Sequence, residues 1–449
     1  MTLLAIAAER GGAAEAAIRE LDGREVGWFR LAGGPHRGAI GPVEGETIAA
    51  LVRQAVDLGI PIVGSMATSG AEVREGVTSL HAWGRVAAAL HRASGVVPVA
   101  LAVVGPCVSG PSLLLGLADV VVMTEDATAW VSGPKAVAEI TGREVDAKAL
   151  GGAGVHGLRS GVAALTAADE DEALASISMV LSYLPDNNHE VPEVWPTDDP
   201  VDRPCSIAAR TVPDTANASY DVRVVVRDVL DDATFVELWG GFAANVVTGF
   251  GSVGGRPVGV IANQPSRLAG TLDIEASQKA ARFVQLCDSF NVSLVTFVDT
   301  PGFQPGKDIE WRGMIRHGAE LVHAYAAATV PRVAVVLRKA YGGAYIVMDS
   351  KGVGNDHYLA WPAAEMAVMG AAGAVEILHG RKGVTAEDRA ALEADYSARY
   401  CSPEIAAKRG YVDRIIAPEE TRAAVASALR ALRNKREHLP ARRHSNTPL

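Results

Sequence analysis

The sequence has few cysteines and no long apolar run. Its 449 residues include four scattered cysteines, Cys107, Cys205, Cys287 and Cys401, with no Cys-X-X-Cys spacing and no histidine at ligand spacing. This pattern argues against a zinc site and a cysteine nucleophile, and it favours a reduced, cytoplasmic chain. No apolar run reaches the ~18 residues that a membrane-spanning helix needs. The opening MTLLAIAAERGG lacks the basic segment of a secretory signal. We therefore expect no membrane insertion, and no metal bound by this chain.

Aromatic residues and an excess of positive charge are also missing. Aromatics make up 5% of the chain and the net charge is −10, which argues against a general nucleic-acid binder. Apolar residues make up 49%, which is enough for substantial cores. The length suggests two or three domains. Plentiful Ala, Gly and Val are typical of an α/β protein with close helix–sheet contacts.

The sequence repeats itself at a nearly constant offset, the one that separates Arg24 from Arg256. GREVGWF at 23–29 resembles GRPVGVI at 255–261, and IPIVGSMATSG at 60–70 resembles VSLVTFVDTPG at 292–302. VPVALAVVGPCVSG at 97–110 resembles PRVAVVLRKAYGG at 331–343, and Trp130 and Trp361 stand at nearly the same separation in related stretches. In each copy, short Val/Ile-rich runs alternate with stretches of helical period. The pattern predicts a duplicated domain with largely parallel sheets covered by helices.

Composition places the boundaries between the copies. We expect a variable N-terminal segment at 1–21, a first domain at 22–184 and a second domain at 226–430. Residues 185–225, rich in Pro, Asp and Asn, are the expected linker. Residues 431–449 form a basic tail that we expect to be irregular.

Each copy places a small, glycine-containing stretch directly after a buried strand. The stretches are Ser109-Gly110 in the first copy and Gly342-Gly343-Ala344 in the second. A glycine there can simply end a strand or permit a positive φ. A turn of this kind that opens a helix also leaves main-chain N–H groups unpaired. Two such donors aimed at a pocket would form an oxyanion hole for a developing enolate or tetrahedral oxygen.

Long stretches of the second half resemble one protein family. They include NQPSRLAGTLDIEASQKAARFVQLCDSFN, FVDTPGFQPG, RKAYGGAYIVM and AWPAAEMAVMGAAGAVEI. They are similar to the carboxyltransferase (β) subunit of biotin-dependent acyl-CoA carboxylases, most closely the propionyl-CoA and acetyl-CoA enzymes. The first half matches more weakly, in ASGVVPVALAVVGPCVSG and LGGAGVHGLRSGVA. The resemblance implies an α/β fold, a tandem duplication of crotonase-like (ClpP/crotonase superfamily) domains.

The resemblance also implies how substrates are shared between the copies. Acyl-CoA would be held mainly by the first domain. Carboxybiotin, delivered on a separate carrier protein, would meet the second domain of a neighbouring subunit. The assembly would be a homo-oligomer, a hexamer built from dimers. Because the ureido nitrogen left by departing carbon dioxide takes the α-proton of the acyl-CoA, the chemistry needs neither a metal nor a side-chain base.

Site residues carry over position by position. By resemblance, Gly343 and Ala344 donate N–H groups to the biotin ureido oxygen, and Ser109 and Gly110 donate them to the thioester carbonyl. The other residues expected to contact substrate or cofactor are Gly342, Tyr345, Ile346, Gly302, Phe303, His156 and Arg74.

Four departures from the family pattern weaken the match, mostly in the first half. A helical segment that usually precedes the match near Asp22 is missing. Glu72 stands where the family has arginine. Either Arg74 compensates for this charge near the CoA phosphates, or the CoA lies elsewhere. Ser109 replaces a glycine and is followed by Pro111. Ile346 stands where propionyl-type enzymes commonly carry aspartate, so the acyl chain length stays open.

The expected function is transfer of a carboxyl group from carboxybiotin to the α-carbon of a short acyl-CoA. The same chemistry could run as a biotin-dependent decarboxylase or transcarboxylase. A divergent paralogue, non-catalytic or biotin-independent, is a further alternative. The chain has no Met-Lys-Met biotin-attachment motif and no ATP-grasp segment. We therefore expect a biotin carboxylase and a biotin carboxyl carrier subunit as partners.

Overall fold

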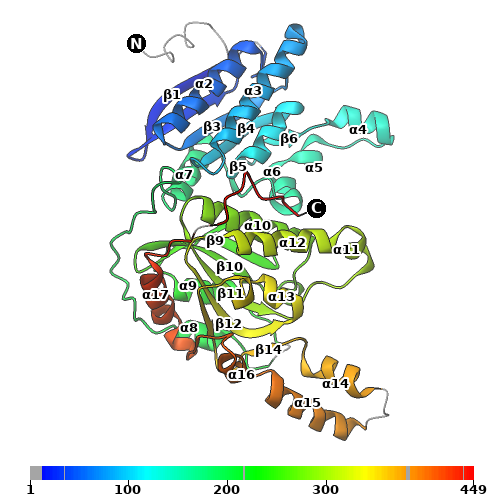
Figure 1. The fold of residues 1–449 in the computed structure, drawn as a ribbon. Helices are drawn as coiled ribbons and strands as arrows, with labels where there is room; N and C mark the ends of the chain where they lie inside the picture. Colours follow the sequence, from blue (N-terminus) through cyan, green and yellow to red (C-terminus); the bar gives the residue numbers. More distant parts are fainter. Residues whose placement is uncertain (1–12, 35, 216–217, 381–384, 438, 449) are drawn as a thin grey trace. The chain divides into compact units, whose positions relative to one another are not determined.

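The computed structural model describes residues 13–34, 36–215, 218–380, 385–437 and 439–448 (Figure 1). The chain packs as two compact units. Unit 1 contains the described residues up to Pro192, with Trp239–Phe242 and Ser289–Asn291. Unit 2 contains Glu193–Leu238, Ala243–Asp288 and the described residues from Val292 onward.

The sheet of unit 1 is parallel except for one antiparallel pair at its edge. The strand order is β1-β2-β3-β4-β5-β7, and the short β6 pairs with the far end of β4. Strand β1 pairs antiparallel with β2, and the other neighbours pair in parallel. The strands are β1 (Ala14–Leu21), β2 (Arg24–Leu31), β3 (Ile62–Thr68), β4 (Val99–Val108), β5 (Val120–Thr124), β6 (Thr128–Trp130) and β7 (Leu165–Ala167).

Helices connect these strands as the periodicity predicts. In α2 (Pro42–Leu58), Pro42 opens the helix and Glu44 accepts the N–H of Gly41. Gly59 ends it in a left-handed conformation. The α-helices of unit 1 are α2 (Pro42–Leu58), α3 (Val77–Ala93), α4 (Pro134–Thr141), α5 (Ala147–Gly151), α6 (Ala153–Val155) and α7 (Glu170–Leu181). Shorter helical turns are η1 (Val73–Glu75), η2 (Gly110–Leu117) and η3 (His156–Ser160, π-helical).

Unit 2 repeats this plan with a longer antiparallel edge. Its strand order is β15-β13-β12-β11-β10-β9-β8, and the short β14 pairs with the far end of β12. Strands β8, β9 and β10 pair antiparallel, and the remaining neighbours are parallel. The strands are β8 (Val236–Leu238), β9 (Val246–Val253), β10 (Arg256–Asn263), β11 (Ser293–Thr300), β12 (Arg332–Tyr341), β13 (His357–Ala360), β14 (Glu365–Ala367) and β15 (Arg414–Ile415).

Helices cover both faces of the second sheet. Helices α9 and α17 share one apolar core with β9, β10, β11 and β12, whereas α10 packs on the opposite face (Figure 1). The α-helices are α8 (Ser206–Thr211), α9 (Val222–Val229), α10 (Ile274–Ser289), α11 (Lys307–Trp311), α12 (Met314–Ala327), α13 (Gly342–Val347), α14 (Ala371–His379), α15 (Ala386–Tyr400), α16 (Pro403–Lys408) and α17 (Thr421–Leu432). The 3₁₀ turns are η4 (Leu268–Gly270), η5 (Lys351–Val353) and η7 (Pro418–Glu420).

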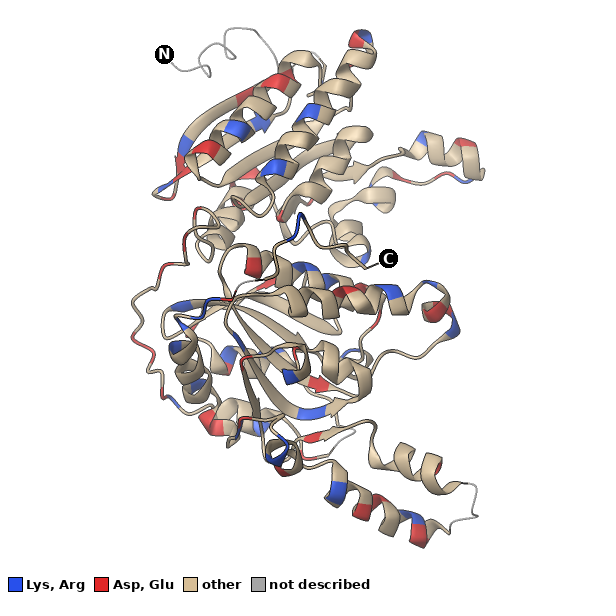
Figure 2. Cartoon of the chain, in the orientation of Figure 1, with Lys and Arg blue, Asp and Glu red and all other residues tan. Residues whose placement is uncertain are grey.

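Charged residues follow this layering. Strand β9 contains none, and β11 contains only Asp299, at its end. Figure 2 shows the charged residues mainly on helices and connections. Such uncharged strands are typical of a sheet that is buried on both faces. Within the described residues, no helix is both long enough and apolar enough to cross a bilayer.

Structural details confirm the duplication at the predicted offset. The ladder between β3 and β4 is interrupted between Met66 and Thr68, and that between β11 and β12 at the equivalent place, between Val298 and Thr300. A side chain on Gly27 would collide with Ala55 of α2, and one on Gly259, its counterpart in the second copy, with Cys287 of α10. The same close approach of helix to strand therefore recurs in both units.

One predicted equivalence is wrong. Trp130 lies in β6, opposite Val108 at the end of β4, whereas Trp361 follows β13. The residue at the corresponding place in unit 2 is Ala367, which lies opposite Tyr341. The connections that lead to β6 and β14 differ in length in the two units. The two tryptophans therefore stand at nearly the predicted offset in the sequence but at different places in the fold.

The segment boundaries also differ from those expected. Strand β1 pairs along its whole length with β2, so a boundary at 21/22 would divide a hairpin, while residues 1–12 lie outside the described residues. Residues 206–225 of the expected linker contain α8 and part of α9, whose apolar side chains belong to the core of unit 2. The tail from Arg433 onward has no regular element among its described residues, but Lys435 forms an ion pair with Asp356.

Candidate active site

The turn from β12 into α13 presents backbone amides at the end of a buried strand. Gly342 has φ +61, a conformation that glycine adopts at little cost. The first amides of an α-helix have no acceptor within the helix, because each would need a carbonyl four residues earlier. In α13 these amides include those of Gly343 and Ala344, the two predicted donors. Ala344 is fully buried.

The ring of Phe303 packs against this turn at Gly343. A methyl group added to Gly343 would lie 3.3 Å from Cε2 of the Phe303 ring, which is closer than most packed contacts. The ring also packs against Gly318 of α12. The neighbouring Gly302 has φ +145, and its N–H is 3.4 Å from Oγ1 of Thr300. The predicted residues Gly302 and Phe303 therefore shape the floor beside α13.

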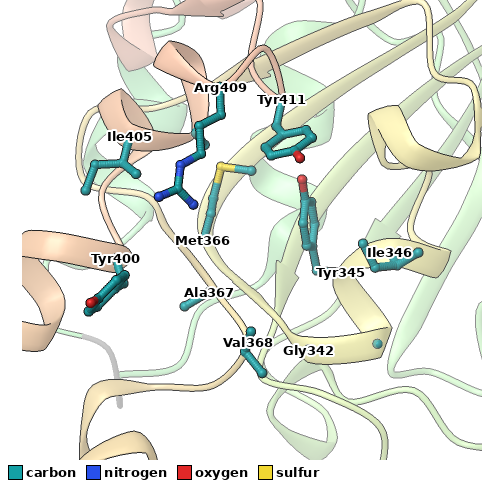
Figure 3. Close-up of a pocket in the computed structure, with 12 residues that line it drawn as sticks. Gly342, Tyr345, Ile346, Met366, Ala367, Val368, Tyr400, Ile405, Arg409 and Tyr411 are labelled. Atoms are coloured by element: carbon teal, nitrogen blue, oxygen red, sulfur yellow. The ribbon is translucent and has the colours of Figure 1, made fainter.

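A pocket of about 370 Å³ opens beside Gly342 and Gly343 (Figure 3). Burial raises the pKa of Tyr345 to about 12, so its hydroxyl stays protonated at neutral pH. In Figure 3 the hydroxyls of Tyr345 and Tyr411 point toward one another, and the guanidinium of Arg409 lies beside Met366. The pocket is lined by Gly342, Gly343, Tyr345, Ile346, Met366, Ala367, Val368, Tyr400, Ile405, Ala406, Arg409 and Tyr411.

The structure thus brings four predicted residues together and adds others. Gly342, Gly343, Tyr345 and Ile346 line one pocket, as a shared role requires. Sequence reasoning missed the opposite wall, which includes Tyr400, Arg409 and Tyr411. Arg409 and Tyr411 lie in the stretch AAKRGYVDRII, which contains no recognisable motif, and only the fold brings it to α13.

Ser109 occupies the corresponding turn of unit 1 under strain. It has φ +63 and ψ −155, a region that is essentially restricted to glycine and costs other residues ~1–3 kcal/mol. Its N–H donates to the carbonyl of Trp130 at 2.9 Å. The prediction that Ser109 offers this N–H to a thioester therefore needs correction, because the pairing of β4 with β6 already uses it. The amide of Gly110 has no acceptor among the described residues.

The two turns are therefore not equivalent as donors. In the alignment of the two copies that matches Gly110 with Gly343, Ser109 matches Gly342 and Pro111 matches Ala344. Proline has no N–H, so unit 1 retains one of the two helix-start donors of unit 2. The indole of Trp83 closes one side of this turn, because a methyl group on Gly110 would lie 3.0 Å from its ring.

Both ring nitrogens of His156 contact protein atoms, one of them in the neighbouring strand β6. Its Nε2 is 2.8 Å from the carbonyl of Ala129 in β6, and its Nδ1 is 2.7 Å from Oγ of Ser160. A neutral ring that donates from Nε2 and accepts at Nδ1 satisfies both contacts. His156 thereby supports β6, the strand that holds the amide of Ser109.

The two charges near the first turn have different environments. Glu72 caps η1 by accepting the N–H of Arg74, and its other oxygen lies 3.3 Å from Nδ1 of His36. The carboxylate that departs from the family pattern is therefore engaged locally. Arg74 is exposed, as a contact to a polyanionic ligand would require.

Asp299 is structural. Its carboxylate is fully buried, accepts from Tyr220 at 2.9 Å and from Nε of Arg338 at 3.1 Å, and also accepts the N–H of Lys339. Burial raises the pKa of Asp299, and the neighbouring positive charges of Arg338 and Lys339 oppose that shift. The group ties β11 to β12 behind the site. Within the described part of the chain, no cluster of three His, Cys, Asp or Glu side chains could hold a metal ion.

Known proteins of one family match nearly the whole length of this chain. The sequence model of the family described as "Carboxyl transferase domain" matches residues 17–447. The propionyl-CoA carboxylase beta chain of Saccharopolyspora erythraea is 44% identical over 447 residues, covering 96% of this chain and 82% of that protein. The methylmalonyl-CoA decarboxylase subunit alpha of Veillonella parvula is 41% identical over 431 residues, covering 96% and 84%. A crystal structure of transcarboxylase 12S, with methylmalonyl-coenzyme A and methylmalonic acid bound, superposes with a TM-score of 0.93 at 39% identity and covers 97% of this chain and 85% of that one.

Proposed function

This chain belongs to the carboxyl transferase family, and we propose that it transfers a carboxyl group from carboxybiotin on a separate carrier protein to the α-carbon of a short acyl-CoA. Its fold is the tandem crotonase-like duplication that the sequence predicted. The observation that carries the proposal is the turn at Gly342-Gly343-Ala344, whose two glycines line an open pocket at the start of a helix.

Unit 2 supplies the groups suited to a polarised carbonyl oxygen. The amides of Gly343 and Ala344 would donate to the ureido oxygen of biotin, which stabilises charge as it develops there. Gly343 fits this role because a side chain at this position would crowd against Phe303 and occupy the space proposed for the ureido ring of biotin. Bound carboxybiotin supplies the carboxyl group and the basic nitrogen, so the chain itself needs to provide only binding and orientation.

Unit 1 is the proposed site of the acyl-CoA thioester. The amide of Gly110 would donate to the thioester carbonyl, and His156 would keep β6 and the turn in place through Ala129. The exposed Arg74 would face the phosphates. Ile346, which is 42% exposed on the wall of the unit 2 pocket, is the proposed selector of acyl chain length.

The relatives bear on the partners and on the direction of transfer. Relatives of this chain include a carboxylase beta chain and a decarboxylase subunit, so the fold is found with both directions of transfer. We favour carboxylation, with a biotin carboxylase and a biotin carboxyl carrier subunit as partners in the cytoplasm. A related crystal structure is described as a hexamer, and we propose a homo-oligomer of that kind here.

The test uses the purified chain with malonyl-CoA or methylmalonyl-CoA, with and without free biotin. Decarboxylated acyl-CoA is measured by mass spectrometry. Biotin-stimulated product supports the proposal, and the preferred substrate identifies the acyl chain. Turnover that ignores biotin would favour a biotin-independent enzyme. No turnover in a chain that still binds CoA would favour a non-catalytic paralogue.

A further inference from the structure

Arg409 is the one charged residue among the described residues that line the pocket beside Gly343. The others are glycines, apolar side chains and tyrosines, and Figure 3 shows the guanidinium of Arg409 beside Met366. The pocket holds about 370 Å³, which is enough for a small ring with a substituent. Because ligand pockets gain specificity from a few placed polar groups, a single cation in an apolar wall favours an anionic ligand.

The end of helix α16 fixes Arg409 and Tyr411 on the same pocket wall. Gly410, between them, has φ +79, the left-handed conformation with which glycine commonly ends a helix. The N–H of Tyr411 donates to the carbonyl of Ala406 at 2.9 Å, and the following Val412 is buried. The backbone of this wall is therefore held by the helix end and by the core, while the side chains of Arg409 and Tyr411 remain exposed.

Arg409 has no acidic partner in the described part of the chain. Its side chain forms neither an ion pair nor a hydrogen bond there. Asp413, the nearest carboxylate that follows it in the sequence, is instead engaged by Nζ of Lys351 at 2.8 Å and by the N–H of Tyr358 at 2.6 Å. The guanidinium, whose planar fork of N–H donors matches the oxygens of a carboxylate, is therefore available to a ligand.

Two tyrosine hydroxyls add donors to the pocket without adding negative charge. In Figure 3 the hydroxyls of Tyr345 and Tyr411 point toward one another. Burial raises the pKa of Tyr345 to about 12, so this hydroxyl stays protonated at neutral pH. Within the described residues, no carboxylate lines the pocket. The wall thus combines hydrogen-bond donors with one positive charge, a set that recognises a carboxylate.

We propose that Arg409 binds the carboxylate of carboxybiotin while it is attached to the ureido nitrogen. The inference rests on the proposed function, which makes carboxybiotin the ligand of this pocket. The ureido oxygen is present in biotin with and without the carboxylate, so donors to that oxygen at Gly343 cannot distinguish the two forms. Arg409 would distinguish them, because it contacts the group that is transferred. The hydroxyl of Tyr411 would donate to the same carboxylate.

The test compares the binding of two stable probes to the full chain. Ethylene urea is a neutral cyclic urea like the ureido ring of biotin, and its N-carboxymethyl derivative carries a carboxylate on the ring nitrogen. Dissociation constants are measured by ligand-observed NMR titration. Wild type should bind the anionic probe at least ~5-fold more tightly than the neutral one, and Arg409→Met should reduce this preference below ~2-fold. Because Arg409 is exposed, added salt should narrow the preference of wild type.

Two further variants separate this contact from a general effect of charge. Lys408→Met removes the neighbouring exposed cation of α16, which does not line the pocket, and should keep the wild-type preference. Arg409→Lys keeps the charge without the planar fork and should keep part of the preference. Equal affinity of wild type for the two probes, or a full wild-type preference in Arg409→Met, overturns the inference. An equal loss in Lys408→Met also overturns it, because any exposed charge near the pocket would then explain the result.

A second arm identifies which molecule carries the carboxylate. Methylmalonyl-CoA and propionyl-CoA differ by a carboxylate, and their dissociation constants are measured in the same variants. Suppose that Arg409→Met weakens methylmalonyl-CoA at least ~5-fold relative to propionyl-CoA and leaves the preference between the urea probes unchanged. Arg409 then binds the carboxylated acyl-CoA, and the assignment to carboxybiotin is overturned. A lost probe preference with an unchanged CoA ratio supports the assignment.

These binding outcomes are distinct from the biotin-stimulated decarboxylation assay. Stimulation by biotin without the probe preference leaves the proposed function standing and removes this inference. A preference that depends on Arg409, without any biotin-stimulated turnover, would keep the carboxylate contact and overturn the proposed function.

Discussion

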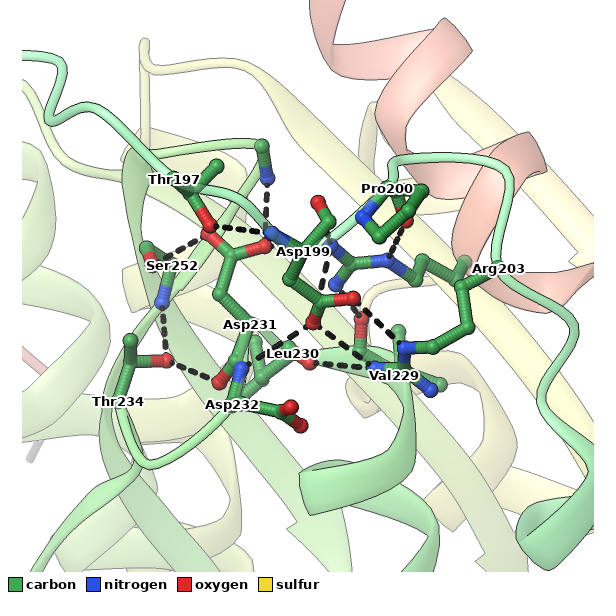
Figure 4. A network of polar contacts seen from close by, with 12 residues as sticks. Thr197, Asp199, Pro200, Arg203, Val229, Leu230, Asp231, Asp232, Thr234 and Ser252 are labelled. Atoms are coloured by element: carbon green, nitrogen blue, oxygen red, sulfur yellow. Dashed lines mark hydrogen bonds and ion pairs between the residues drawn. The ribbon is translucent and has the colours of Figure 1, made fainter.

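Arg422 of α17 is the centre of a buried charge network whose loss should destabilise unit 2. Figure 4 shows its two carboxylate partners, Asp199 and Asp231. The side chain of Arg422 is 0% exposed and contacts Asp231, which is 2% exposed, at 2.6 Å and Asp199, which is 7% exposed, at 3.3 Å. It also donates to the carbonyls of Pro200, Val229 and Asp199. The network thereby attaches the segment after Glu193 to the sheet.

Arg422→Met keeps much of the side-chain volume and removes all of these donors. Breaking a buried ion pair costs ~3–5 kcal/mol, because the partner stays charged and buried. Asp231 keeps three donors, from Ser252, Gly254 and Gly255, which limits the loss. The three carbonyls that lose their donor from Arg422 increase the loss of stability. We expect the unfolding free energy of unit 2 to fall by about 4 kcal/mol.

The assay is urea unfolding combined with hydrogen exchange of peptides from 193–238. The matched control is Arg430→Met, an exposed arginine of the same helix, which should change stability by less than ~0.5 kcal/mol. In Arg422→Met/Asp231→Asn, where the orphaned charge is also removed, we expect recovery of at least half of the loss. A cost similar to that of the control, or unchanged exchange in 193–238, would refute the reasoning.

The same network should show in the pH dependence of stability. Burial opposes ionisation of Asp231, but hydrogen bonds from Ser252, Gly255 and Arg422 outweigh it and lower its pKa. The folded state therefore binds the proton less readily than the unfolded state. The stability that Asp231 contributes is present above the unfolded pKa of ~3.9 and is lost as pH falls through the lower folded pKa. Arg422→Met should move this acid loss to higher pH.

Three further predictions concern single side chains. Burial lowers the pKa of Lys279 to about 7. Between that pH and the unfolded pKa of ~10.4 the unfolded state binds more protons than the folded state, so the free energy of unfolding rises with pH. Lys279→Met should flatten this rise, as measured by urea midpoints across the same pH range. Ile346→Ala enlarges the pocket wall and should raise the kcat/KM ratio of longer to shorter acyl-CoA by roughly tenfold, and an unchanged ratio would remove Ile346 as a selector. His156→Ala leaves the buried carbonyl of Ala129 without a donor and should destabilise unit 1 by ~1–3 kcal/mol with little change in the KM for acyl-CoA; a raised KM alone would instead indicate direct substrate contact.

Much of the fold could be predicted because a duplication leaves a record in the spacing of residues. The constant offset correctly matched β2 with β10 and β3 with β11, and it extends to the ladder irregularities after Met66 and Val298. Isolated residue matches were less informative, as the misplaced pair of Trp130 and Trp361 shows. Connections between strands change length freely, so a shared residue type at nearly the right offset is weak evidence.

The site could be predicted only where backbone chemistry leaves a trace in the sequence. Small residues after a strand pointed to Gly342 and Gly343, which the structure places beside a pocket. Arg409 and Tyr411 reach that pocket through the fold, and nothing in their local sequence indicates it. The hydrogen bond from Ser109 to Trp130 was out of reach for the same reason, because it depends on the register of β6.

The most direct test of the central claim compares two glycine substitutions in unit 2. Gly343→Val places a side chain against Phe303 at the turn proposed to bind the biotin ureido oxygen. Gly306→Val adds the same bulk at an exposed position with room around it. The measurement is biotin-stimulated decarboxylation of methylmalonyl-CoA, as the difference between rates with and without biotin. We predict that Gly343→Val loses this difference by on the order of 10²-fold while Gly306→Val retains it. Equal biotin stimulation in the two variants would contradict the account.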